Sequence, residues 1–209
     1  MKSDVQIILT RTLSYISGVF LFLSAHPLVN PDFGWHLRTG EQIWLRGEIP
    51  KVDWFSYSAP GYPWVCHSWL QDLVLYGLWS AASSLGIEFW GARLFYALWG
   101  VGLVCLLQKS FLKSDVSGET RAWVFFALSI LVLALKLLRP QIASAVGFVL
   151  VLWGYDALKK AIDLGDRGRV RAVLFSLPLI MSVWANLHAG FIVAYLFIAA
   201  LCFGNAVDL

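Results

Sequence analysis

The stretch SWLQDLVLYGLWSAASSLGIE, residues 68–88, decides the expected membrane topology of the chain. Its first four residues match the capping-box pattern, so we expect a helix that begins at Ser68 and runs to about Gly86. Only 15 uncharged residues separate Asp72 from Glu88, whereas a membrane-spanning helix needs about 20 residues. The stretch therefore predicts a helix that lies on a membrane surface rather than one that crosses the membrane.

The composition indicates a polytopic membrane protein. Of the 209 residues, 59% are hydrophobic and only 14% are charged, and 11 are Trp. This profile argues against a soluble fold, and the length leaves room for roughly six spans of about 20 residues. Neither standard Gly-rich nucleotide loop is present, so a cytosolic nucleotide site is not indicated. No nucleic acid is expected as a partner. The three cysteines are widely separated, which suggests neither a disulfide framework nor a thiolate metal site.

The distribution of basic residues sets the expected topology. If residues 68–85 lie outside, the next span brings the chain inward, and the basic loops around Lys109 and Lys159 become cytoplasmic. If residues 68–85 crossed the membrane, both loops would be outside, against the positive-inside tendency of short loops. The first arrangement is therefore preferred, and its later spans are expected at about 89–107, 122–138, 141–155, 172–187 and 191–206.

The expected fold is an all-α membrane protein with about six transmembrane helices in a single module, residues 1–209. A first span, residues 12–31, follows a short basic start and is expected to be a retained anchor rather than a cleaved signal peptide. Residues 32–88 form a long extracytoplasmic loop with short amphipathic helices, and its Trp and Tyr residues suit a membrane interface. Residues 89–207 hold five further spans, which places both termini in the cytoplasm.

The run PDFGWHLRTGE, residues 31–41, concentrates two acids, a histidine and an arginine in an otherwise apolar chain. Asn30 suits an N-cap, so a short helix is expected to open here and to end at Gly47. Asp32 and His36 would then share one face of the helix. The alternative interpretation is an interfacial helix whose polar groups simply face water.

Two outer turns carry the other polar clusters, LRPQ at residues 138–141 and WANLHAG at residues 184–190. Arg139 lies just before the next span, so its guanidinium and the free N–H groups of a helix N-terminus can bind one anion. Alternatively, Arg139 reaches outward to lipid headgroups. His188 and Asn186 either bind sugar hydroxyls or merely close a tight turn.

These features resemble the C-type glycosyltransferase superfamily (GT-C), integral membrane enzymes that use polyprenyl-phosphate sugars. The shared architecture is one span, a long outer loop that opens with an acid, an amphipathic surface helix, and outer turns with polar motifs. A bacterial group of membrane proteins with that architecture is similar at residues 32–41, 55–61, 67–70, 138–141 and 184–191. The resemblance covers about residues 12–200. Because GT-C enzymes are longer, the chain is expected to be an N-terminal module, a truncated form or a fragment.

The resemblance implies transfer of a sugar from a polyprenyl-phosphate donor to a cell-envelope glycan, lipid or protein, outside a bacterial plasma (inner) membrane. Asp32 matches the first-loop acid that acts as base or metal contact in the superfamily. Related arabinosyl and mannosyl transferases carry a second acid beside it, but here the neighbour is Phe33, and Glu41 is the nearest substitute. Asp32 and Glu41 are therefore the expected catalytic residues. No resident cofactor is expected, although a divalent metal fits the family. The expected substrate-binding residues are His36, Arg38, His67, Arg139, Gln141, Asn186 and His188.

Two other functions compete with a transferase. A transporter would use the outer polar groups as a vestibule, but it should also carry ionisable residues near the middle of the membrane or spans broken by Gly and Pro. The expected spans show almost none of these. A non-catalytic assembly or metal-binding subunit is the other alternative, since one carboxylate and three imidazoles can converge as ligands: Asp32, His36, His67 and His188.

Overall fold

The computed structural model describes residues 32–111, 117–134 and 141–207, together with Val5, Ile8, Thr12, Ile16 and Ser17. Within these residues the chain is all-helical, apart from an isolated antiparallel bridge between Val52 and Pro63. Most of the predicted first span, residues 12–31, lies outside the described part of the chain, and so does Arg139.

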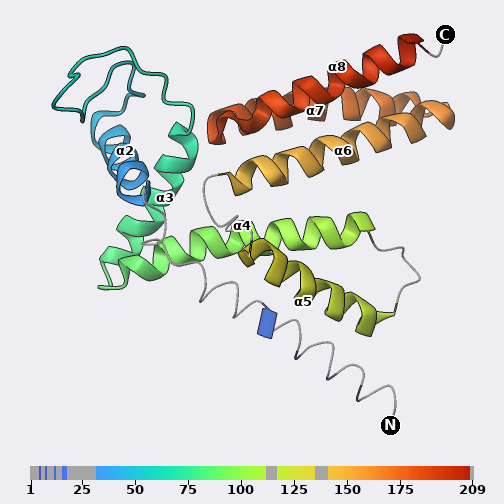
Figure 1. Cartoon of the computed structure of the whole chain (residues 1–209), viewed down its shortest axis with the longest axis horizontal. Helices are drawn as coiled ribbons and strands as arrows, with labels where there is room; N and C mark the ends of the chain where they lie inside the picture. Colours follow the sequence, from blue (N-terminus) through green and yellow to red (C-terminus); the bar gives the residue numbers. More distant parts are fainter. Residues whose placement is uncertain are drawn as a thin grey trace.

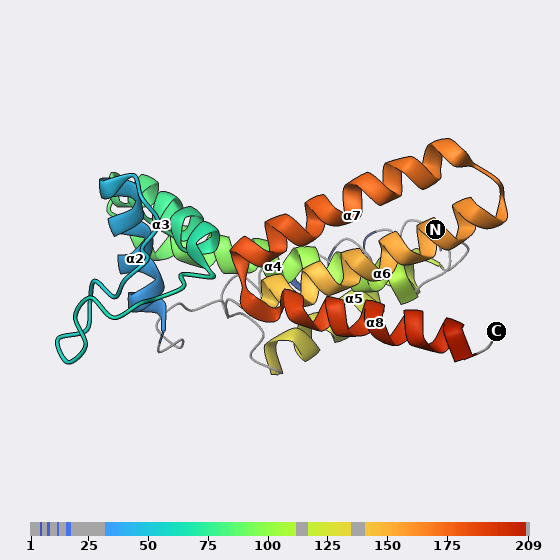
Figure 2. The ribbon, with the colours of Figure 1, turned by 90° about the horizontal axis from the view of Figure 1, so that it is seen from above.

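The described helices fall into two groups (Figure 1). Two helices that run across the others, α2 and α3, lie beside the start of α4 and beyond one end of α6, α7 and α8, and the view in Figure 2 shows the same arrangement. The helices are α2 (Phe33–Arg46), α3 (Trp69–Ser83), α4 (Glu88–Phe111), α5 (Gly118–Ala134), α6 (Ile142–Asp163), α7 (Arg167–Leu187), the short 3₁₀ helix η2 (Ala189–Phe191) and α8 (Ile192–Val207).

Three of the described helices are long and apolar enough to cross a membrane, namely α6, α7 and the Glu88–Leu107 part of α4. Helices α5 and α8 have 17 and 16 residues, fewer than the about 20 residues that a span needs. The predicted all-helical architecture with apolar spans is therefore confirmed in outline. The described helices do not by themselves establish six spans.

Successive long helices alternate in direction, so their connections gather at two opposite ends (Figure 1). The connection from α7 to α8 lies at the end where α2 and α3 are found, and the connection from α6 to α7 lies at the other end. The polar turn around His188 therefore belongs to the same end as α2 and α3. The basic residues Lys159, Lys160, Arg167, Arg169 and Arg171 belong to the opposite end.

Helix α2 packs closely against α3 because a glycine faces the contact. A Cβ atom at Gly40 would lie 2.0 Å from the backbone oxygen of Asp72, so only glycine permits this approach. The helix ends as predicted at Gly47, whose φ of 69° is left-handed, with its N–H bonded to the carbonyl of Ile43. It begins later than predicted, because Asp32 rather than Asn30 is the N-cap; Asn30 lies outside the described residues.

Helix α3 begins at the predicted place but without the predicted cap. Ser68 is its N-cap residue, yet the serine side chain caps no backbone N–H. The hydroxyl donates instead to Oδ2 of Asp72, at 3.1 Å, and Gln71 is buried with no partner for its Oε1 among the described residues. The capping-box interpretation is therefore wrong. The helix also ends at Ser83, three residues before Gly86, where φ turns positive.

The apolar core joins the two groups of helices. One buried cluster links α2, α3 and α4 through Phe33, Leu75 and Phe95, and further clusters link α4 to α6 and α6 to α8. Helices α6 and α7 approach closely where Gly147 faces the ring of Trp184, which is 2% exposed. This packing holds the last turn of α7 against the first turns of α6.

Candidate functional site

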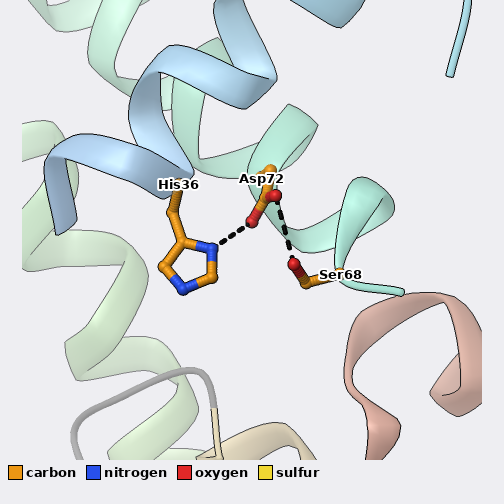
Figure 3. A network of polar contacts seen from close by, with 3 residues as sticks. All are labelled: His36, Ser68 and Asp72. Carbon is orange, nitrogen blue, oxygen red and sulfur yellow. Dashed lines mark hydrogen bonds and ion pairs between the residues drawn. The ribbon is translucent and has the colours of Figure 1, made fainter. Parts of the chain in front are cut away.

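A buried carboxylate on α3 holds a histidine on α2. The Nδ1 atom of His36 lies 2.7 Å from Oδ1 of Asp72, and the other carboxylate oxygen accepts the hydroxyl of Ser68 (Figure 3). Asp72 is only 1% exposed. Burial raises the pKa of Asp72 above its ordinary value of 3.8, while the hydrogen bonds from His36 and Ser68 act in the opposite direction. The second ring nitrogen of His36 points away from Asp72.

A second histidine, His188, is fixed between α7 and α8. The backbone N–H of Gly190 donates to its Nδ1 at 3.1 Å, and the hydroxyl of Ser144 lies 2.7 Å from the same atom. The indole N–H of Trp184 donates to the Ser144 oxygen at 3.0 Å, so the serine can pass its own hydrogen on to His188. An Nδ1 that accepts hydrogen bonds carries no hydrogen, and the neutral ring therefore presents an N–H at Nε2.

Helix α3 and the residue before its N-cap are tied to the end of α7 by further polar and ring contacts. The indole N–H of Trp69 donates to Oδ1 of Asn186 at 2.5 Å, and the rings of His67 and His188 lie edge to face with centroids 6.2 Å apart. Burial lowers the pKa of His188 below its ordinary value of 6.5, and the charges of His67 and His36 lower it further. The side chains at this end of the helices thus form one cluster, called the polar cluster below: His36, His67, Ser68, Trp69, Asp72, Ser144, Asn186 and His188.

The structure brings together four of the predicted site residues. His36, His67, Asn186 and His188 belong to the cluster. The imidazole of His36, which was predicted to act with Asp32, is hydrogen-bonded to Asp72, and Asp32 is an exposed residue at the start of α2. Two further predicted residues, Arg38 and Glu41, form an ion pair with each other on α2. Gln141 is exposed at the N-cap of α6.

Three residues of the cluster were not singled out from the sequence: Ser68, Asp72 and Ser144. A signal for Asp72 was present, because it is the only charged residue between His67 and Glu88 and follows Ser68 by one helical turn. An acid in the first turn of an apolar helix is also a common favourable placement against the helix dipole. The sequence pattern therefore does not distinguish an ordinary helix-start acid from one that is buried against a histidine.

The cluster does not form a recognisable metal centre. Across the part of the chain that the structure describes, no group of three or more His, Cys, Asp or Glu side chains is placed to hold a metal ion. Cys66, next to His67, is 6% exposed, and burial raises the pKa of its thiol to about 12. The thiol therefore behaves as a small apolar group.

Two apolar pockets open beside the cluster. One, of about 420 Å³, lies between α3, α4, α6 and α7, and the other, of about 390 Å³, lies between α4, α6 and α7. They share Trp99, Val146 and Leu187, and their sizes fall in the range of roughly 300–1,000 Å³ that is usual for ligand sites. Leu187 immediately precedes His188, so the shared wall of the pockets reaches the polar cluster.

Comparisons with models of protein families, with curated proteins and with solved structures give no match for this chain. Its chemistry is therefore inferred from its own residues. They place imidazoles, a buried carboxylate, an amide and a hydroxyl at one end of apolar helices, beside pockets lined only by apolar side chains.

Proposed function

We propose that the protein is an integral membrane glycosyltransferase that transfers a sugar from a polyprenyl-phosphate donor to a hydroxyl of a cell-envelope acceptor. The observation that carries the proposal is the pair of apolar pockets that ends beside the polar cluster. A polyprenyl-phosphate sugar also has an apolar part next to a polar part, because its long apolar chain is joined to a charged phosphate and a polar sugar. The pockets would hold the lipid chain, and the cluster would receive the head of the molecule.

The proposed reaction needs a base for the acceptor hydroxyl and hydrogen-bond donors for the phosphate that leaves. Two groups on neighbouring turns are candidates for the base, namely Asp32, which the family resemblance favours, and His36. The Nε2–H of His188 and the amide of Asn186 are suited to oxygen atoms of the phosphate or sugar. Arg139, just before α6 in the sequence, remains a proposed phosphate contact.

The proposed orientation places the cluster outside the plasma (inner) membrane. The five basic residues near the α6–α7 connection lie at the end opposite the cluster, and short basic loops are usually cytoplasmic. The exposed aromatic residues of the segment between α2 and α3, such as Tyr57 and Tyr62, suit the outer interface of the bilayer. In this orientation the chain is a multi-pass protein with both termini in the cytoplasm.

The proposal is tested by filling the pockets while leaving the cluster intact. Val146 lines both pockets, so Val146→Trp should weaken binding of a polyprenyl-phosphate sugar about tenfold or more, because the lipid chain and the indole compete for the same space. Leu196→Trp is the control, since Leu196 is 67% exposed on α8 and lines neither pocket. Donor binding and sugar transfer are measured on purified protein in lipid. Equal donor affinity in both variants, or no transfer by the wild-type protein, would contradict the proposal.

A further inference from the structure

The contacts of His36 leave one of its ring nitrogens available for chemistry. Its Nδ1 lies 2.7 Å from Oδ1 of Asp72, and because an ionised carboxylate can only accept a hydrogen bond, Nδ1 is the donor in this pair. With its hydrogen on Nδ1, the neutral imidazole carries a lone pair on Nε2, which points away from Asp72 (Figure 3). The imidazole is thus held in the one neutral form that can take a proton at Nε2.

The carboxylate that holds His36 is itself fixed on its other side. The hydroxyl of Ser68 donates to Oδ2 of Asp72 at 3.1 Å, and the Asp72 side chain is 2% exposed, against 16% for the His36 side chain. The close approach of α2 to α3 at Gly40 keeps the two helices in register at this position. Asp72 is therefore too deeply buried to meet a substrate, whereas His36 is accessible.

On the basis of the function proposed above, we infer that Nε2 of His36 is the base for sugar transfer and that Asp72 is the residue that positions it. The acceptor oxygen forms a bond to the anomeric carbon as the bond between that carbon and the phosphate oxygen breaks. The acceptor proton moves to Nε2 of His36, and the electron pair of the broken bond leaves on the polyprenyl phosphate. Asp72 then stabilises the imidazolium that forms, in the manner of a carboxylate–histidine pair.

Two observations favour His36 over Asp32 as the base. Asp32 is exposed at the first residue before α2, so its surroundings do not shield a reaction from water. His36 lies in the cluster with His188, whose ring has the opposite tautomer and presents an N–H rather than a lone pair. One imidazole that accepts a proton and one that donates a hydrogen bond are the two complementary groups that the transfer needs.

The base is identified by removal and chemical rescue. His36→Ala should lower kcat for sugar transfer by about 10² to 10⁴-fold and leave donor binding unchanged, and added imidazole should restore part of the lost rate. His36→Gln is the second variant, because its amide can still donate to Asp72 while it cannot act as a base; it should be as slow as His36→Ala and should stay folded. Asp32→Asn is the comparison variant for the competing base, and its kcat should fall less than that of His36→Gln.

The role of Asp72 is tested by a double-mutant cycle. Asp72→Asn should lower kcat on its own, but in the His36→Ala background it should change kcat by less than about threefold, because a positioning residue acts only through the residue it positions. A purely structural role would lower the rate by the same factor in both backgrounds. Full activity of His36→Gln together with loss of activity in Asp32→Asn would overturn the inference and leave the proposed function standing. Absence of transfer in the wild-type protein would instead contradict the proposed function.

Discussion

His188 is the residue whose protonation is most clearly set by its surroundings. Burial and the neighbouring His67 and His36 lower its pKa below 6.5, and the Gly190 N–H and the Ser144 hydroxyl both bind the neutral form of Nδ1. Protonation at Nδ1 would break this arrangement. The ring is therefore expected to stay neutral at neutral pH and to keep its hydrogen on Nε2.

This lowered pKa predicts that the stability of the protein falls as the medium is acidified. As the pH drops below 6.5, the unfolded chain binds a proton at His188 more readily than the native protein does, so the free energy of unfolding decreases with falling pH. Between pH 7.5 and 5.5 the midpoint of thermal unfolding should decrease more in the wild-type protein than in His188→Gln. Asp72, whose pKa is raised, has the opposite pH dependence, but it is present in both proteins and cancels in the comparison. Equal decreases in the two proteins would contradict the prediction.

At the level of single residues, the sequence predicted which types of side chain would meet but not which ones would pair. His36, His67, Asn186 and His188 could be named because polar residues are rare in an apolar chain. The partner of His36 could not be named, because Asp32 is four residues away in sequence whereas Asp72 is 36 residues away. Local spacing favours the nearer acid, and only the packing of α2 against α3 selects the other.

The pairing of α2 with α3 gives a prediction at the level of helices. In Gly40→Ala the new methyl group would meet the backbone of Asp72 at 2.0 Å, so the two helices must separate. Overpacking of this kind costs about 1–3 kcal/mol, and the contact between His36 and Asp72 should be lost with it. Gly34→Ala is the matched control, because it lies on the same helix with no atom within 4 Å; it should be neutral or slightly stabilising. Chemical unfolding of both variants measures the difference, and equal stability would show that the helices are free to move apart.

The helices themselves were predicted with different success. The short distance between Asp72 and Glu88 correctly separated two helices, since α3 ends at Ser83 and α4 begins at Glu88; the placement of α3 on a membrane surface stays a prediction. The predicted spans 141–155 and 172–187 are shorter than the helices α6 and α7. An apolar run ends at the first charged residues, whereas α6 continues to Asp163 and α7 already starts at Arg167. Asp166 caps α7 by accepting the N–H of Arg169 at 2.9 Å. An Asp at this position is a local sequence signal for the start of a helix.

The arrangement of the whole molecule gives a prediction about topology. Tyr57, in the segment between α2 and α3, is 98% exposed, and Gly168 is an exposed residue at the basic end. In intact cells, Tyr57→Cys should react with a membrane-impermeant maleimide, and Gly168→Cys should react only after permeabilisation, because basic loops are retained in the cytoplasm. The native Cys66 is unsuitable as a reporter, since it is buried and its pKa is raised to about 12. The reverse labelling pattern would place the polar cluster in the cytoplasm.

The general architecture followed from composition, whereas the pockets did not. A composition of 59% hydrophobic residues with long uncharged runs predicts apolar helices, and this prediction does not depend on which helices pack together. The pockets depend on where Trp99 and Val146 come to lie after α4 and α6 have packed. Such contacts join residues far apart in the chain and leave no periodic pattern in the sequence.

The hydrogen bond between Trp69 and Asn186 bears on the order in which the molecule is made. These two residues are 117 positions apart, and at a synthesis rate of about 5–20 residues per second the ribosome needs roughly 6–23 s to travel from one to the other. The apolar cluster of α2, α3 and α4 uses only residues that have emerged by Trp99, so this part can pack early. In the nascent protein, His36 and Asp72 can therefore come together several seconds before His188 and Asn186 are made and complete the cluster.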